Sequence, residues 1–280
     1  MRSVRLFLRA FLGRWTTPLS VLLLLAVVGM AATAPLLFPE DPWSMVTMPL
    51  QWPGENPEYP LGSDALGRDL AAGVFHGARV SLLIGLAATA ASAGLGIAVG
   101  ALAGYYGGWV DDVLMRVTEA FQTIPPFIFT IVVVTLLVPS VPVVVLAIAL
   151  VSWPTVARLV RAEFLALRDR DFVQSCHAIG MGGPRIMVTQ MLPNTLAPVI
   201  VTTSIGVATA ILTESSLAFL GLGDPNVMSW GTIIASGREM LRTNWYLTAI
   251  PGVAILVTVL ALNLIGEGLN DALNPRLRNR

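Results

Sequence analysis

The sequence contains no lysine, because all 17 of its basic residues are arginine, and 17 acidic residues balance them to a net charge of zero. A Walker nucleotide site needs a lysine on the phosphates, and a Schiff-base enzyme needs one to form its imine. The chain therefore cannot hydrolyse ATP in the Walker manner, and any energy from ATP has to come from another polypeptide. The balanced charge gives no reason to expect a nucleic-acid partner.

Cysteine and histidine are nearly absent as well. Cys176 is the one cysteine, so no disulfide can form within this sequence. His76 and His177 are about a hundred residues apart, which is not the spacing of metal ligands. The sequence also has no Ser/His pair at helical spacing and no His-x-x-x-His motif. We therefore expect no catalytic residue, no metal site and no cofactor in this chain.

Charged residues make up only 12% of the chain against about 25% in soluble domains, while 55% of the residues are hydrophobic. This composition predicts an all-α membrane protein. Six apolar stretches meet or approach the roughly 20 residues that a bilayer core requires: 17–38, 80–103, 117–138, 142–160, 196–220 and 247–265. We expect six transmembrane helices, of which the third and fourth form a tight hairpin.

The orientation of these spans follows from the distribution of charge. The N-terminus carries arginines at positions 2, 5, 9 and 14, whereas the loop 39–77 carries six acidic residues and one base, Arg68. The positive-inside rule then places the N-terminus in the cytoplasm and this loop outside. Six spans then return the C-terminus, with arginines at 276, 278 and 280, to the cytoplasm. The same count places the loop 161–194 there as well. A cleaved signal peptide is the alternative for the first stretch, but its apolar run is too long for one, so we favour an uncleaved anchor.

The second span carries small residues at every fourth position: Ala88, Ser92, Gly96, Gly100 and Gly104. Such a stripe lets two helix backbones approach closely in a membrane. We favour packing within this chain over an interface between subunits.

Few polar residues lie inside the predicted spans. Glu119 follows Arg116 by three residues, and we prefer an ion pair between them to a proton relay. Glu214 has no local partner, and we expect it to bond to a neighbouring helix or chain rather than to act in transport. Pro125 and Pro126 are expected to kink the third span.

The loop 161–194 has its own helix signals. Asp171 with Gln174 fits a capping box, and Gly180 fits a helix end, so a short helix is predicted over 172–179. The run 182–184 starts another helix, which Pro193 is expected to end before the fifth span.

The short helix has the composition of a docking element. Phe172, Val173, Cys176 and Ile179 form one predicted apolar stripe, and a two-turn helix needs a partner to be stable. Residues of both charges, including Arg168 and Arg170, flank this helix. Such a rim of mixed charge gives a protein–protein interface its register and specificity. A helix lying at the lipid surface is the alternative interpretation.

The segment 171–180, followed by Leu192-Pro193-Asn194, resembles the EAA loop of binding-protein-dependent ABC importer permeases, with Gln174-Ser175-Cys176 where the family has Glu-Ala-Ala. In that family a coupling helix inserts into a cleft of the ATPase. The resemblance implies these coupling residues in this chain: Arg168, Arg170, Asp171, Phe172, Val173, Gln174, Cys176, His177, Ile179 and Gly180.

Further segments are similar to the C-type permease of dipeptide, oligopeptide and nickel importers: 61–69, 77–82, 214–223, 229–231, 251–252, 263–266 and 274–276. The resemblance implies a type I ABC importer transmembrane domain at 78–280, preceded by a helix and acidic outer loop at 1–77. It also implies a bacterial cytoplasmic-membrane location, a second (B-type) permease, two cytoplasmic ATPases that bind ATP and Mg²⁺, and an external binding protein. The expected cargo is a di- or oligopeptide. The alternatives are a nickel or other metal chelate, or a self-sufficient secondary transporter.

Overall fold

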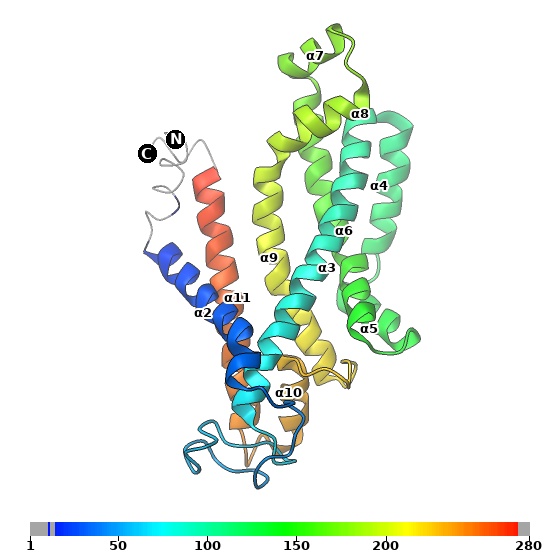
Figure 1. The fold of residues 1–280 in the computed structure, drawn as a ribbon. Coiled ribbons are helices and arrows are strands. Elements are labelled where there is room, and N and C mark those ends of the chain that lie inside the picture. Colours follow the sequence, from blue (N-terminus) through cyan, green and yellow to red (C-terminus); the bar gives the residue numbers. More distant parts are fainter. Residues whose placement is uncertain (1–10, 12–14, 274–280) are drawn as a thin grey trace.

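The computed structural model describes residue 11 and residues 15–273, and this part of the chain is helical, with two isolated bridges and no strand. The arginines at 2, 5, 9, 14, 276, 278 and 280, on which the predicted orientation rests, lie outside the described residues. The all-α prediction is confirmed. The elements are α2 (Thr16–Leu37), α3 (Leu70–Tyr106), α4 (Gly108–Gln122), α5 (Pro126–Leu136), α6 (Val141–Arg168), α7 (Asp171–Ala178), α8 (Gly183–Ile186), a π-helix (Met187–Met191), α9 (Leu192–Phe219), α10 (Trp230–Gly237), a 3₁₀ turn (Arg238–Met240) and α11 (Tyr246–Leu273) (Figure 1).

Five helical segments of the described chain are long and apolar enough to cross a membrane, and α4 with α5 makes a sixth when this bent pair is counted as one span. The prediction of six spans is confirmed on that count. The end of α11 and the short helix α7 lie toward one end of the bundle, and α2 begins about half-way along it (Figure 1). The loop 38–69, which follows the first span, and α10, which follows the fifth, lie at the other end.

The third span differs from the prediction of a kinked helix over 117–138. The chain is helical from Gly108, stops at Gln122, and resumes at Pro126 in a direction turned by 82°. Two consecutive prolines remove two backbone donors, and the residue before each is disfavoured in a helix. The break is therefore sharper than a single-proline kink, and α5 and α6 form the predicted hairpin.

Two helices extend beyond the predicted spans. α3 is 37 residues long and begins at Leu70, where the Asp69 carboxylate accepts a hydrogen bond from the backbone N–H of Ala71. α6 continues to Arg168. The ends of both predicted loops, 39–77 and 161–194, are therefore helical.

The stripe of small residues on α3 lies against α6. A Cβ atom added at Gly96 would lie 2.6 Å from Cβ of Val156, and one added at Gly104 would lie 2.5 Å from Cβ of Phe164. A Cβ at Gly100 would overlap the carbonyl oxygen of Ala157. Ala88 and Ser92 are buried on the same line. The structure thus uses the stripe for packing within the chain.

Candidate functional site

The short helix α7 begins one residue earlier than predicted. Arg170 has an extended backbone and occupies the N-cap position, and no side chain caps the helix. The predicted capping box is therefore wrong, because Asp171 is already the first helical residue. Gln174 instead donates from Nε2 to the backbone oxygen of Arg168 at 3.1 Å. The Asp171 carboxylate still lies in the first turn, where it complements the helix dipole.

The C-terminal end of α7 follows the prediction for Gly180. This residue has φ of +79°, and its N–H donates to the oxygen of His177 at 2.9 Å. The N–H of Met181 donates to the oxygen of Cys176 at 3.0 Å. These two bonds form a Schellman motif, which needs a residue in the left-handed region at Gly180.

The apolar residues of α7 do not form the single predicted stripe. Val173 is fully buried in a cluster with Phe164 of α6 and Ile186 of α8, and Cys176 packs half-buried against the same cluster. Phe172 and Ile179 are 40% and 77% exposed. The face that carries Val173 and Cys176 therefore anchors α7 to the bundle. Phe172 and Ile179 are seven residues apart in sequence and form a second face, which stays exposed.

The charged and polar groups predicted around α7 gather at the same end of the bundle. Arg168 lies 3.7 Å from Asp169, and its Nη1 would lie 2.6 Å from a Cβ atom added at Gly107. The His177 ring stacks on Tyr105 with centroids 6.2 Å apart. Arg170, Asp171 and Gln174 are exposed beside it. The structure thus brings the predicted coupling residues together, with Val173 and Cys176 turned inward.

Pro193 does not end the helix that starts at Gly183, as was predicted. The segment 183–219 is one continuous helix whose residues Met187–Met191 form a π turn. The N–H of Leu192 bonds to the oxygen of Met187, five residues back, and Asn194 donates from Nδ2 to the oxygen of Gln190 at 2.6 Å. The wider turn accommodates the proline, which lacks an N–H. Only the turn 179–182 therefore separates α7 from the helix that continues into the span α9.

A second group of charges lies between α4 and α6. Arg161 donates from Nε and Nη2 to the two carboxylate oxygens of Asp111, both at 2.5 Å. The predicted pair of Arg116 with Glu119 is present at 3.4 Å and is exposed. These groups border a cavity of about 530 Å³ lined by Asp111, Asp112, Met115, Arg116, Glu119, Arg158 and Arg161. Sequence reasoning missed the Asp111–Arg161 pair, because nothing in the sequence links positions so far apart.

Glu214 is buried and bonds to a neighbouring helix, as predicted. Its Oε1 accepts a hydrogen bond of 2.6 Å from the hydroxyl of Ser229, which also caps α10 by accepting from the N–H of Thr232. The hydroxyl of Ser215 donates to Oε2 at 3.3 Å. The helix α10 was not predicted, although a serine followed three residues later by threonine is a capping signal.

α10 also connects to α3 through Trp230. The indole Nε1 donates to the backbone oxygen of Val74 at 2.9 Å, and the backbone N–H donates to the hydroxyl of Ser81 at 3.2 Å. The Trp230 side chain is fully buried over Gly77. α10 therefore joins α3 to α9 at the end of the bundle opposite α7 (Figure 1).

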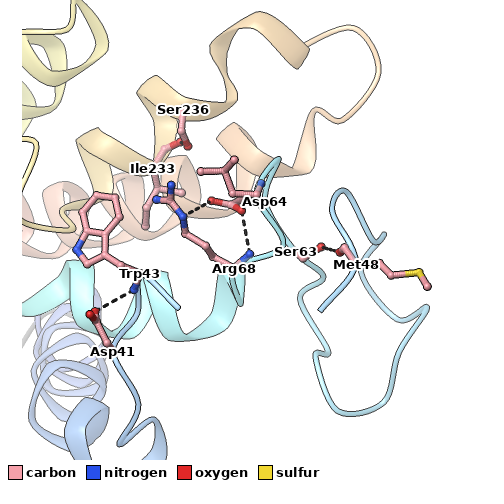
Figure 2. A network of polar contacts seen from close by, with 9 residues as sticks. Asp41, Trp43, Met48, Ser63, Asp64, Arg68, Ile233 and Ser236 are labelled. Atoms are coloured by element: carbon pink, nitrogen blue, oxygen red, sulfur yellow. Dashed lines mark hydrogen bonds and ion pairs between the residues drawn. The ribbon is translucent and has the colours of Figure 1, made fainter. Parts of the chain in front are cut away.

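The acidic loop 38–69 is ordered around the pair of Asp64 and Arg68 (Figure 2). Asp64 Oδ1 accepts from the N–H groups of Leu66 and Arg68, and Oδ2 lies 3.5 Å from Arg68 Nε. The Arg68 guanidinium lies 4.7 Å from the ring centroid of Trp43, a cation–π distance. These contacts hold the loop in one conformation around Asp64 and Arg68.

The same loop is tied to the helices at two further points. The Tyr246 hydroxyl at the start of α11 donates to the backbone oxygen of Ser63 at 3.0 Å. Asp69 caps α3, and burial raises the pKa of its carboxyl, while hydrogen bonds from the N–H groups of Ala71 and Ala72 lower it. The loop 38–69 is thus fixed across this end of the bundle.

The sequence matches the family model described as binding-protein-dependent transport system inner membrane component over residues 96–279. The di/tripeptide transport system permease protein DppC of Pseudomonas aeruginosa is 39% identical over 265 residues, covering 92% of this chain and 88% of the relative. The dipeptide transport system permease protein DppC of Haemophilus influenzae is 38% identical over 93% of this chain and 90% of the relative. A putative peptide transport system permease of Brucella suis is 40% identical over 96% and 91%.

These matches agree with the helical bundle and with the short helix α7 on its end. The chain is a transport subunit and not an enzyme, and a subunit of this kind implies an ATPase, a substrate-binding protein and a second permease as partners. It is a multi-pass integral membrane protein and belongs to the binding-protein-dependent inner membrane components of ABC importers, in the dipeptide and oligopeptide permease group.

Proposed function

We propose that this chain forms one half of the passage of an ATP-driven importer of di- or oligopeptides, and that α7 couples it to a separate ATPase. The relatives that cover nearly the whole chain are named dipeptide, di/tripeptide or peptide permeases, which supports this cargo. The observation that carries the coupling role is the exposed pair Phe172 and Ile179 on a helix anchored by buried Val173.

The coupling proceeds through packed helices. Val173 lies in one cluster with Phe164 of α6 and Ile186 of α8, and α8 continues through the π turn into α9. A displacement of α7 is therefore transmitted to two spans at once. Two such permeases with two ATPases, which bind ATP and Mg²⁺, would alternate between two arrangements of the bundle as nucleotide binds and leaves. The external binding protein delivers the peptide.

The orientation that this function requires places α7 in the cytoplasm and the loop 38–69 outside. Single cysteines at Ile179 and Glu58, in a chain with Cys176→Ser, test it with a membrane-impermeant thiol reagent. Ile179→Cys should react only in inverted vesicles, and Glu58→Cys only in intact spheroplasts. The opposite pattern would reverse the orientation.

The outer loop is the candidate contact for the external binding protein. It is fixed by Asp64 and Arg68 (Figure 2), and it presents the exposed acidic residues Glu55 and Glu58. Reversing both charges to arginine should raise the concentration of binding protein needed for half-maximal uptake without lowering ATPase co-purification. Unchanged uptake would exclude this contact.

The experiment that tests the whole proposal is ATP-driven uptake of radiolabelled dialanine into vesicles that contain the assembled importer. The chain alone should transport nothing, and unlabelled dipeptides should compete while nickel chelates should not. Ile179→Asp should reduce both ATPase co-purification and uptake. Leu241→Asp, an apolar position between α10 and α11 that is 47% exposed, is the control for co-purification.

A further inference from the structure

α9 carries a row of hydroxyl side chains on the face that the rest of the described chain leaves open. The row consists of Thr202, Thr209, Thr213 and Ser216. Thr209 and Ser216 are exposed, and the other two are half-buried. Spacings of seven, four and three residues bring these side chains to one face of a helix. At about 1.5 Å of rise for each residue, the row extends for about 21 Å, from near the Phe219 end of α9 to beyond its middle. It therefore runs along much of a bilayer core of about 30 Å.

Three hydroxyl groups of this row have already used their protons within α9. Thr209 donates to the backbone oxygen of Ile205 at 3.1 Å. Thr213 donates to the backbone oxygen of Thr209 at 2.9 Å. Ser216 donates to the backbone oxygen of Leu212 at 2.7 Å. A hydroxyl has one proton to donate and two lone pairs that accept. The row therefore offers hydrogen-bond acceptors to whatever covers it.

A cavity of about 500 Å³ lies beside the Phe219 end of this row. Ser216 and Leu212 of α9 line it, together with Phe127 of α5 and Ile255 of α11. Its volume falls within the roughly 300–1,000 Å³ of small-molecule sites. The cavity thus has walls from three spans, and its polar lining includes a hydroxyl of the row.

Three kinds of partner could cover the row, and they differ in the donors that they bring. Lipid tails bring none, and they are better matched by the aliphatic face of α2, where Leu19, Leu22 and Leu25 are exposed. A helix of the second permease has used its backbone N–H groups in its own i→i−4 bonds. A di- or oligopeptide is too short for a stable helix, so its N–H groups are free to donate. A row of acceptors therefore suits a peptide best.

We propose that this face of α9 is a wall of the passage, along which N–H groups of the transported peptide bond to the hydroxyl oxygens of Thr209, Thr213 and Ser216. This inference rests on the proposed function. Backbone N–H groups do not depend on side chains, so such a wall accepts many peptide sequences. Neutral acceptors hold a ligand weakly, and a series of weak sites lets it move from one to the next.

The test uses the assembled importer in lipid nanodiscs, with Cys176→Ser and a reporter cysteine at Leu212, which lines the cavity and is 45% exposed. Modification of this chain is measured with a charged and with an apolar thiol reagent. Leu22→Cys on α2, a position that is 64% exposed, is the lipid-facing control reporter. Ala210→Cys, at a buried position on another face of α9, is the covered control.

The charged reagent should modify Leu212→Cys and leave both control reporters unmodified. Modification of Leu212→Cys by the apolar reagent alone would assign this face to lipid and overturn the proposal. A reporter that reacts in the isolated chain, but with neither reagent in the assembled importer, would assign the face to the second permease and overturn it as well.

Peptide contact is then tested by protection of the Leu212→Cys reporter. Dialanine at about ten times its dissociation constant should slow modification about tenfold. The combined variant Thr209→Val, Thr213→Val and Ser216→Ala should raise the dialanine concentration for half-maximal protection by about 2–10-fold for each hydrogen bond lost. Thr33→Val on α2, whose hydroxyl likewise donates to its own helix, should leave that concentration unchanged.

An analogue of dialanine in which an ester oxygen replaces the peptide N–H keeps both charged ends. It should require a concentration about 2–10-fold higher than dialanine does, because it lacks one donor. This difference should disappear in the combined variant. Equal protection by the two compounds in the parent chain, no protection by dialanine, or full protection of the combined variant would each contradict the proposal.

Failure of this inference can be distinguished from failure of the proposed function. If the importer takes up dialanine but the peptide does not protect the reporter, the function stands and the hydroxyl wall does not. If no ATP-driven uptake of dialanine occurs, the proposed function itself is wrong. Co-purification of the ATPase with every variant verifies that the importer is assembled.

Discussion

Arg161 of α6 holds Asp111 of α4 by two parallel hydrogen bonds of 2.5 Å, so that the charged ends of two spans are joined side chain to side chain. Asp111→Asn leaves Arg161, whose side chain is 34% exposed, without its anion. We expect a loss of about 1–2 kcal/mol in the free energy of unfolding, less than for a fully buried pair.

The matched control is Glu119→Gln, which breaks the exposed pair with Arg116 on the same helix. This change should alter stability by less than about 0.5 kcal/mol. Unfolding in a titration with sodium dodecyl sulfate, followed by tryptophan fluorescence, measures both variants. Equal losses would contradict a special role for the Asp111–Arg161 pair.

Ser229→Ala removes two interactions with one atom. The hydroxyl donates to buried Glu214 and accepts from the N–H of Thr232 at the start of α10. We expect the free energy of unfolding to fall by about 2–3 kcal/mol, because a cap is lost and a buried carboxylate loses its closest donor. The control is Ser216→Ala, whose exposed hydroxyl bonds only to the backbone of its own helix. If the two variants unfold alike, α10 is not fixed through Ser229.

Gly100→Ala and Gly94→Ala test the close approach of α3 to α6. A methyl group at Gly100 would overlap the oxygen of Ala157 and lie 2.9 Å from Cβ of Val160, whereas one at Gly94 meets nothing within 4 Å. The first change should destabilise the chain by about 1–3 kcal/mol through overpacking. The second should stabilise it by up to about 1 kcal/mol through helix propensity. The same detergent titration compares them, and a stable Gly100→Ala chain would mean that α6 can move away.

Gly180→Ala tests the end of α7. The left-handed backbone at this position, φ +79°, costs about 1–2 kcal/mol for a residue with a side chain. The end of α7 should loosen, and co-purification of the ATPase should decrease while the amount of chain in the membrane stays constant. Gly182→Ala, at an extended position with nothing within 4 Å of the added methyl, is the control. Normal ATPase binding by Gly180→Ala would show that the Schellman end is not needed for docking.

Much of the bundle could be predicted from the sequence, because a bilayer imposes a simple rule on composition. Runs of about 20 apolar residues locate α2, α6, α9 and α11, and a four-residue period of small side chains identifies the face of α3 that contacts α6. Hydropathy says nothing about where a helix continues beyond the bilayer, so the start of α3 at Leu70 and the end of α6 at Arg168 were missed.

The site was harder to predict, because its details depend on contacts between distant segments. The sequence predicted a short helix that ends at a glycine within 171–180. It could not predict that Val173 is buried while Phe172 is exposed, because this difference arises from the packing of α6 and α8 against one side of α7. Asp111 and Arg161 carry no joint signal along the chain. The two prolines at 125 and 126 predicted a bend, while its angle depends on how α4 packs.

The π turn at Met187–Met191 contains one more residue than a regular α-helical path between the same ends. Each residue of an α-helix rotates the chain by about 100°. Deleting Thr189 and restoring regular helix would therefore turn Ile186 by that angle about the axis of α9, away from Val173. The one additional residue of the π turn thus sets the direction in which α8 and α7 leave α9, and loss of one codon there would change that direction without shortening any other helix of the described chain.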